Sequence, residues 1–182
     1  LALLGLLFPS VGASLPSIEE AYRITISKSG ILSALVQLGY ASFCFFGGIL
    51  SEKKKKKHIL IGGAVLYAVA GLILSVSPLW SVTLLLFLGM GIGSGLVFIS
   101  SNTLVIELYP DRRGTFLNIH HTFFAAGSLV APLIVSLLHS RSYEWFTTFF
   151  ILGFIALLIG IIMSMSNVSA LLPQSVKAAR SN

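Results

Sequence analysis

The chain has 182 residues, of which 55% are hydrophobic and only 10% are charged, and its formal net charge is +6. A soluble domain carries about 25% charged residues, so this composition excludes that class and indicates a polytopic membrane protein. The positive charge does not indicate a nucleic-acid partner, because it is concentrated in short segments between apolar runs. The single cysteine, Cys44, cannot form a disulfide within the chain and is expected to be a small core residue.

The first apolar run covers residues 1–11 and is too short to span a bilayer alone, since about 20 residues are needed. Two interpretations are open: a signal peptide, because small residues follow the run, or the truncated end of a first membrane helix. The run contains no basic residue and five further spans follow it, which favours the truncated helix. The charged segment 17–29 is then predicted to be a loop on the outer side.

The rest of the chain divides into apolar spans separated by short polar turns. The uncharged run 59–106 would measure about 72 Å as one helix, so it must turn, and Pro78 with Trp80 marks the place. Pro132 is expected to kink the fifth span. The predicted helices after the first are 30–50, 59–76, 80–106, 115–138 and 145–165.

Five consecutive lysines, residues 53–57, lie between the second and third spans and fix the orientation of all of them. Positively charged loops stay in the cytoplasm, so this loop and the one around Arg112 and Arg113 are predicted to be cytoplasmic. By this topology nine of the twelve Lys and Arg residues are cytoplasmic, and so are both termini. We expect an integral protein of the plasma (inner) membrane, in contact with lipid.

Polar side chains inside membrane spans are costly and therefore candidates for function. His120 and His121 are adjacent and point about 100° apart on a helix, so only one readily faces a central cavity. We favour His121, which could hydrogen-bond a polyol or carry a proton, because histidine titrates near physiological pH. Bonding between neighbouring helices is the alternative role for the amides. The predicted substrate-binding residues are Gln37, Asn102, Asn118 and His121.

Glycines recur in the fourth span at Gly89, Gly91, Gly93 and Gly95, with the spacing that lets two helix backbones approach closely. Packing is the simpler interpretation, and a helix thinned to pivot or to line a passage is the functional one. Ser94 in this cluster, with a histidine of the fifth span, would be the nucleophile and base of a rhomboid-like intramembrane protease. The residues before the serine do not match the G-x-S-G pattern of that class, which argues against the protease. We predict that the chain is not an enzyme and that it uses no cofactor or metal.

The loops carry a resemblance to the amino-terminal half of a major facilitator superfamily transporter. Gly48-x-x-x-Glu52-Lys53-x-Lys55-Lys56-Lys57 is similar to the G-x-x-x-D-R-x-G-R-R loop of that family, although Lys55 replaces the second glycine. Glu107-x-x-Pro110-x-x-Arg113-Gly114 is similar to the loop between its helices 4 and 5. In the family these loops form a cytoplasmic charge network that latches helix ends in one state. The resemblance places that network at Gly48, Glu52, Lys53, Glu107 and Arg113.

The resemblance implies an all-α fold of six transmembrane helices, arranged as two inverted three-helix repeats and forming half of a twelve-helix transporter. Residues 1–166 would be the six-helix bundle, and residues 167–182 a cytoplasmic linker to a missing second half. The substrate would lie at the midplane between the halves, and rocking of one half against the other would give alternating access. The implied function is secondary active or facilitative transport of a small polar solute, with a non-transporting membrane interaction protein as a further alternative.

The stretch from Leu117 to Leu133 is similar to helix 5 of the fucose-permease-like sugar porters, which favours a sugar as the solute. The chain departs from that pattern in three places. Phe87 stands where the family has an arginine, and Gly12 and Phe98 stand near the positions of the carboxylates of sugar–proton symporters. Coupling to a proton could therefore use His121, reside in the second half, or be absent.

Overall fold

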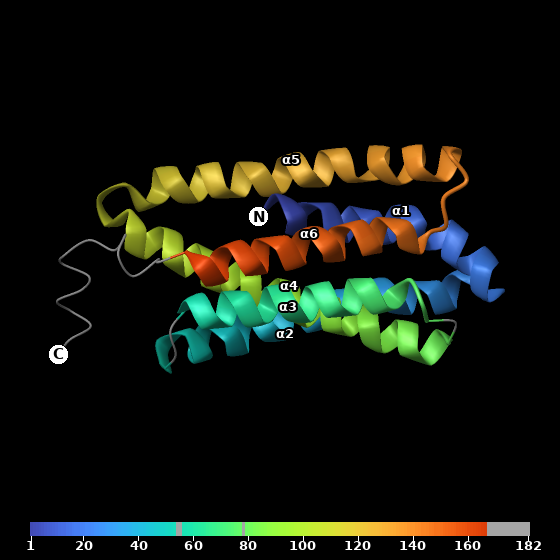
Figure 1. The fold of residues 1–182 in the computed structure, drawn as a ribbon, viewed down its shortest axis with the longest axis horizontal. Coiled ribbons are helices and arrows are strands. Elements are labelled where there is room, and N and C mark those ends of the chain that lie inside the picture. The colour runs from blue at the N-terminus through green and yellow to red at the C-terminus, as the bar shows by residue number, and fades with distance from the viewer. Residues whose placement is uncertain (54–55, 78, 167–182) are drawn as a thin grey trace.

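The computed structural model describes residues 1–53, 56–77 and 79–166, with the side chains of residues 51–53 excepted. Figure 1 shows long helices lying side by side, with turns at both ends. All six long helices are apolar enough to cross a membrane, which confirms the predicted all-α, six-helix membrane fold. The helices within the described ranges are α1 (Ala2–Tyr22), α2 (Ile26–Lys53), α3 (Lys56–Leu74), α4 (Trp80–Leu108), the 3-10 turn η1 (Pro110–Arg112), α5 (Arg113–Ser140) and α6 (Phe146–Met165).

The predicted outer loop at residues 17–29 is wrong, because most of that segment is helical. Helix α1 continues to Tyr22, and α2 begins only four residues later at Ile26. Arg23 ends α1 in the left-handed conformation, with φ of 51°, and its amide donates to backbone carbonyls of the last turn. The prediction equated the helix with the uncharged run, whereas charged residues readily occupy the turn where a helix leaves the bilayer.

Prolines within the spans do not interrupt the helices that contain them. Pro9 and Pro16 lie inside α1, and Pro132 lies inside α5, with α-helix on both sides of each. Proline removes one backbone hydrogen bond, and neighbouring groups in a membrane bundle compensate for the loss. Helix α5 continues through Pro132, and the kink expected there stays a prediction.

The helices on either side of the lysine run extend into it. Helix α2 extends to Lys53 and α3 already begins at Lys56, so both helices include part of the run. Lys55, the residue that replaces the family's second glycine, lies outside the described residues, as does the tail 167–182. The helical start of α3 places Lys56 and Lys57 on its first turn.

The helices pack in pairs that follow the order expected for inverted repeats. Helix α1 packs mainly on α5, α2 mainly on α4, and α3 on α6. If α1, α2 and α3 exchange places with α4, α5 and α6, respectively, the α1–α5 pair becomes the α4–α2 pair and the α3–α6 pair maps onto itself. A two-fold axis in the membrane plane requires this relation. The contact between α3 and α4 is at least as extensive as that between α3 and α6, whereas α6 and α1, their counterparts under this exchange, contact each other only slightly, so this contact departs from the two-fold relation.

Glycines allow α4 to lie against α2 on one side and α3 on the other. A Cβ at Gly95 would lie 2.5 Å from the carbonyl oxygen of Tyr40 on α2, and Gly91 is equally tight against the same helix. A Cβ at Gly93 would lie 2.6 Å from the carbonyl oxygen of Gly63 on α3. The glycine cluster therefore acts in packing, as the simpler interpretation predicted.

The core between α3, α4 and α6 is closed by aromatic rings. Phe87 of α4 and Phe149 of α6 are fully buried, with ring centroids 4.9 Å apart in an edge-to-face arrangement. Edge-to-face packing is a favoured geometry for aromatic pairs. Phe87 stands where the family has an arginine, so in this chain that position is part of the apolar core.

Hydrogen bonds tie the helix ends together on the side of the α1–α2 turn. The Tyr22 hydroxyl lies 2.7 Å from Oγ1 of Thr83, a fully buried residue of α4, and it also donates to the Ser77 carbonyl at 3.3 Å. The hydroxyl of Ser29, near the start of α2, donates to the carboxylate of Glu19 at the end of α1. These contacts fix the ends of α1, α2 and α4 relative to one another.

Candidate functional site

Aromatic rings from α1, α2, α4 and α5 meet in one continuous row, which we call the aromatic belt. Phe8 of α1 lies 5.0 Å from Tyr40 of α2, measured between ring centroids, and Tyr40 lies 5.5 Å from Phe98 of α4. Phe98 in turn lies 5.8 Å from the imidazole of His121 on α5. The belt thus joins α1 to the three helices that carry the predicted substrate-binding residues, α2, α4 and α5.

The predicted substrate-binding residues lie one helical turn from members of the belt. Gln37 precedes Tyr40 by three residues on α2, and Asn118 precedes His121 by three residues on α5. Gln37, Asn118 and His121 are all exposed, so their polar groups are free to meet a solute or a facing protein surface. The arrangement offers amide and imidazole groups beside aromatic rings.

Asn102 follows Phe98 by one turn on α4 and is half-buried. Its Oδ1 atom is buried and has no hydrogen-bond partner among the described residues. A buried polar atom without a partner destabilises the fold, and such atoms are rare in native structures. Asn102 is therefore the predicted site residue with the strongest structural reason to bind something else.

The two adjacent histidines of α5 have different surroundings. His120 is half-buried, and its Nε2 atom lies 3.2 Å from the Ser101 hydroxyl on α4. His121 is exposed and contacts the ring of Phe98. This is the division of roles expected from their angular separation, although the binding role of His121 stays a prediction.

Gly12 lies one turn beyond Phe8 on α1, near the position of a carboxylate in the sugar–proton symporters. No heavy atom lies within 4 Å of the place where a Cβ at Gly12 would be. The backbone therefore leaves room at Gly12 for a side chain that this sequence does not provide. Packing is not the reason for the missing carboxylate.

At the predicted charge network, Glu107 pairs with Lys56, a residue that the prediction did not include. The ammonium of Lys56 lies 2.7 Å from the Glu107 carboxylate, and both side chains are mostly buried. The side chains of Glu52 and Lys53 lie outside the described residues, Gly48 packs near Ile99, and Arg113 is exposed at the start of α5. Lys56 takes part because α3 begins there, which a loop assignment for residues 53–57 does not reveal.

Lys57 holds the end of α6. Its ammonium donates to the carbonyl oxygens of Ser164 at 2.8 Å and Ser166 at 2.6 Å. The last carbonyls of a helix lack partners within the helix and carry partial negative charge, so a lysine there stabilises the end. Adjacent lysines on the first turn of α3 thus contact the ends of two other helices, α4 and α6.

The protease alternative requires Ser94 to contact a histidine, and the described residues do not bring them together. Ser94 is fully buried in α4, and its hydroxyl donates to the carbonyl of Met90 on the same helix at 2.7 Å. Of the histidines of α5, His120 contacts Ser101 and His121 contacts Phe98. The local geometry gives Ser94 no base.

Sequence reasoning missed most of the aromatic belt. Phe8 and Tyr40 lie in apolar runs where aromatic residues are abundant, and the chain has 13 phenylalanines and 5 tyrosines. No spacing distinguishes a ring that contacts rings of two other helices from one that faces lipid. Only the pairing of α1 with α5 and α2 with α4 brings these rings together.

These features define a class: a polytopic membrane bundle whose α1, α2, α4 and α5 share a partly exposed aromatic and polar face. The sequence model of the Major Facilitator Superfamily matches residues 1–179. The chain belongs to the Major Facilitator Superfamily. It is an integral membrane protein of that family, and the match does not assign it to the fucose-permease-like sugar porters.

Curated relatives share the same region of sequence. Protein TsgA of Salmonella arizonae is 29% identical over 165 residues, which cover 88% of this chain and 41% of the relative. The protein TsgA homolog of Citrobacter koseri is 28% identical over 158 residues, covering 85% of this chain and 39% of the relative. Protein TsgA of Salmonella typhi is 28% identical over 165 residues. The chain thus spans about two fifths of the length of these relatives.

Proposed function

We propose that the chain forms one six-helix half of an alternating-access transporter and binds a small polar solute at the face formed by α1, α2, α4 and α5. The observation that carries the proposal is the aromatic belt, with exposed Gln37, Asn118 and His121 beside it. A second six-helix half would cover this face and close the site. The bilayer surrounds the remaining helices.

A sugar is the solute class that this site favours. Aromatic rings provide flat apolar surfaces for the C–H faces of a pyranose, while amides and an imidazole bond its hydroxyl groups. The unpaired oxygen of Asn102 adds an acceptor for a hydroxyl donor. Facilitated diffusion and proton symport both fit such a site, and His121 is the proton carrier that we propose for this half.

The test is uptake by the full-length transporter in proteoliposomes, with a panel of radiolabelled monosaccharides and polyols offered at several pH values. We expect saturable uptake of at least one solute and a fall of at least about tenfold in kcat/KM for His121→Ala, since substrate and site groups then lose a hydrogen bond. His58→Ala, which changes an exposed histidine of α3 that belongs to neither site, is the matched control and should transport normally.

Two results would count against the proposal. Unchanged uptake and unchanged pH dependence in His121→Ala would remove His121 from the site. Normal transport by variants of Gln37, Asn102 and Asn118 as well would place the solute away from this face, whatever solute is carried.

A further inference from the structure

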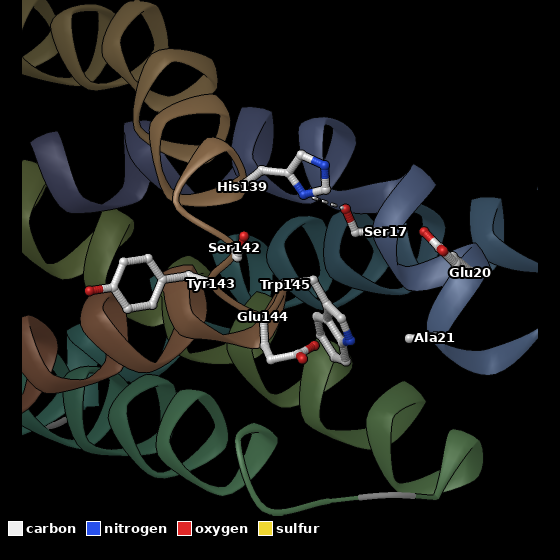
Figure 2. A pocket seen from close by; sticks show the side chains of 8 residues that line it. All are labelled: Ser17, Glu20, Ala21, His139, Ser142, Tyr143, Glu144 and Trp145. Atoms are coloured by element: carbon white, nitrogen blue, oxygen red, sulfur yellow. Dashed lines mark hydrogen bonds between the residues drawn. The ribbon is translucent and has the colours of Figure 1, made fainter.

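A cavity lies at the opposite end of the bundle from the lysine run, where α1, α5 and α6 meet (Figure 2). Its volume is about 420 Å³, within the range of pockets that bind small molecules. Figure 2 shows Ser17 and Glu20 on α1 and Glu144 and Trp145 on the turn that leads into α6. His139, at the end of α5, lies 3.4 Å from the Ser17 hydroxyl.

The lining of the cavity is acidic, with two exposed carboxylates and His139 as its titratable groups other than Tyr143. Glu20 and Glu144 both line it, and neither carboxylate forms an ion pair with another described residue. Arg23 and Arg141 are close in sequence to these acids, yet neither arginine lines the cavity. The lining therefore carries two carboxylates and no lysine or arginine, which favours a cationic ligand.

Trp145 gives the cavity a fixed aromatic wall. Its ring centroid lies 5.9 Å from that of Tyr22 and 6.2 Å from that of Phe149, so neighbouring rings hold it in place. Together with Glu144 it also lines a second cavity of about 430 Å³ beside Tyr22. Tryptophan is the best of the aromatic side chains for binding a cation over its face.

A buried hydroxyl lies in a smaller pocket that shares lining residues with the cavity. Ser14 of α1 is only 1% exposed, and its Oγ atom has no hydrogen-bond partner among the described residues. It lines a niche of about 10 Å³, whose walls include Ser17, Glu144 and Trp145 of the larger cavity. A niche of this size holds about one water molecule, so Ser14 provides an unsatisfied polar group where a ligand or its bound water would reach.

We propose that this cavity binds a small organic ammonium ion. The carboxylates of Glu20 and Glu144 balance its charge, Trp145 lies against its alkyl groups, and Ser14 bonds a water or hydroxyl in the niche. The site is separate from the aromatic belt, since it involves α6 and the far ends of α1 and α5.

The experiment is isothermal titration of the full-length protein in lipid nanodiscs with choline chloride, against the neutral isostere 3,3-dimethyl-1-butanol. We expect saturable choline binding and no saturable binding of the alcohol. Glu20→Gln and Glu144→Gln should each weaken choline binding about fivefold, because each removes one of two balancing charges. Trp145→Leu should weaken it by a similar factor.

Asp111→Asn is the matched control, because it removes one negative charge from an exposed position at the other end of the bundle. It should bind choline as the unchanged protein does. The proposal is overturned if choline does not bind, if the alcohol binds equally well, or if the Glu20→Gln/Glu144→Gln double variant keeps full affinity. If choline instead binds elsewhere in the full-length protein, the double variant will keep its affinity for choline, and this result also overturns the proposal.

Discussion

The Lys56 ammonium lies 2.7 Å from the Glu107 carboxylate and joins the first turn of α3 to the last turn of α4. In sequence the two residues are 51 positions apart, and the long hairpin between them reaches the far end of the bundle and returns. The ion pair therefore closes the α3–α4 hairpin at its open end. Both side chains are mostly buried, so solvent screens their attraction less than that of a surface pair.

Lys56→Gln should lower the free energy of unfolding in detergent by up to about 1 kcal/mol, since the ion pair is only partly shielded from water. The measurement is a double-mutant cycle with Glu107→Gln, in which the stability of each variant is determined by thermal unfolding. We expect the two changes together to cost less than the sum of the single changes. Strict additivity would mean that the pair contributes nothing to stability.

Gly93→Ala should destabilise the bundle by about 1–3 kcal/mol, because the added methyl group would overlap the Gly63 carbonyl of α3. Gly89→Ala is the matched control on the same helix. A Cβ there meets only Ala70 at 3.6 Å, an ordinary contact, so helix propensity should make it neutral or stabilising by up to about 1 kcal/mol. Equal melting temperatures for the two variants would contradict the close approach of α3 and α4.

Tyr22→Phe should lower the free energy of unfolding by about 1–3 kcal/mol, because it leaves the buried Thr83 hydroxyl without its 2.7 Å partner. Adding Thr83→Val removes the unpaired group as well. The double variant should therefore be no less stable than Tyr22→Phe alone, as judged by unfolding in detergent. A further loss of stability in the double variant would show that the hydroxyl of Thr83 is satisfied in another way.

Asn102→Leu should separate stability from function. The side chains are similar in size and the Asn102 oxygen is buried without a partner, so the change should leave the melting temperature unchanged or raise it. Transport by the full-length protein should fall, since the acceptor for the solute is lost. A large drop in melting temperature would instead assign Asn102 a role in holding helices together.

Much of the fold could be predicted because membrane spans follow from length and apolarity alone. The six helices, and the turn before Trp80, were all expected from these properties. The end of α1 could not be predicted in this way, because Glu19 and Glu20 are charged but helical. Charge marks where a chain meets water, and a helix can extend beyond that point.

The candidate site was predictable only where polarity is unusual for a membrane span. Gln37, Asn118 and His121 stand out on that basis, and in the structure His121 belongs to the belt while Gln37 and Asn118 lie one helical turn from a belt residue. The place of Tyr40 in the belt depends on which helices are neighbours, and hydropathy does not indicate helix neighbours. The pairing of Lys56 with Glu107 was missed for a related reason, because it depends on the exact start of α3.

The hydrogen bonds from Lys57 to the carbonyl oxygens at the end of α6 have a mechanical consequence. Ser166, the last described residue, is one of the two residues whose carbonyl oxygens accept hydrogen bonds from Lys57. A pull applied to the chain beyond that point is therefore transmitted to α3 as well as to α6. Since the neighbouring Lys56 is tied to α4 through Glu107, the load is shared by three helices instead of unwinding the last turn of one.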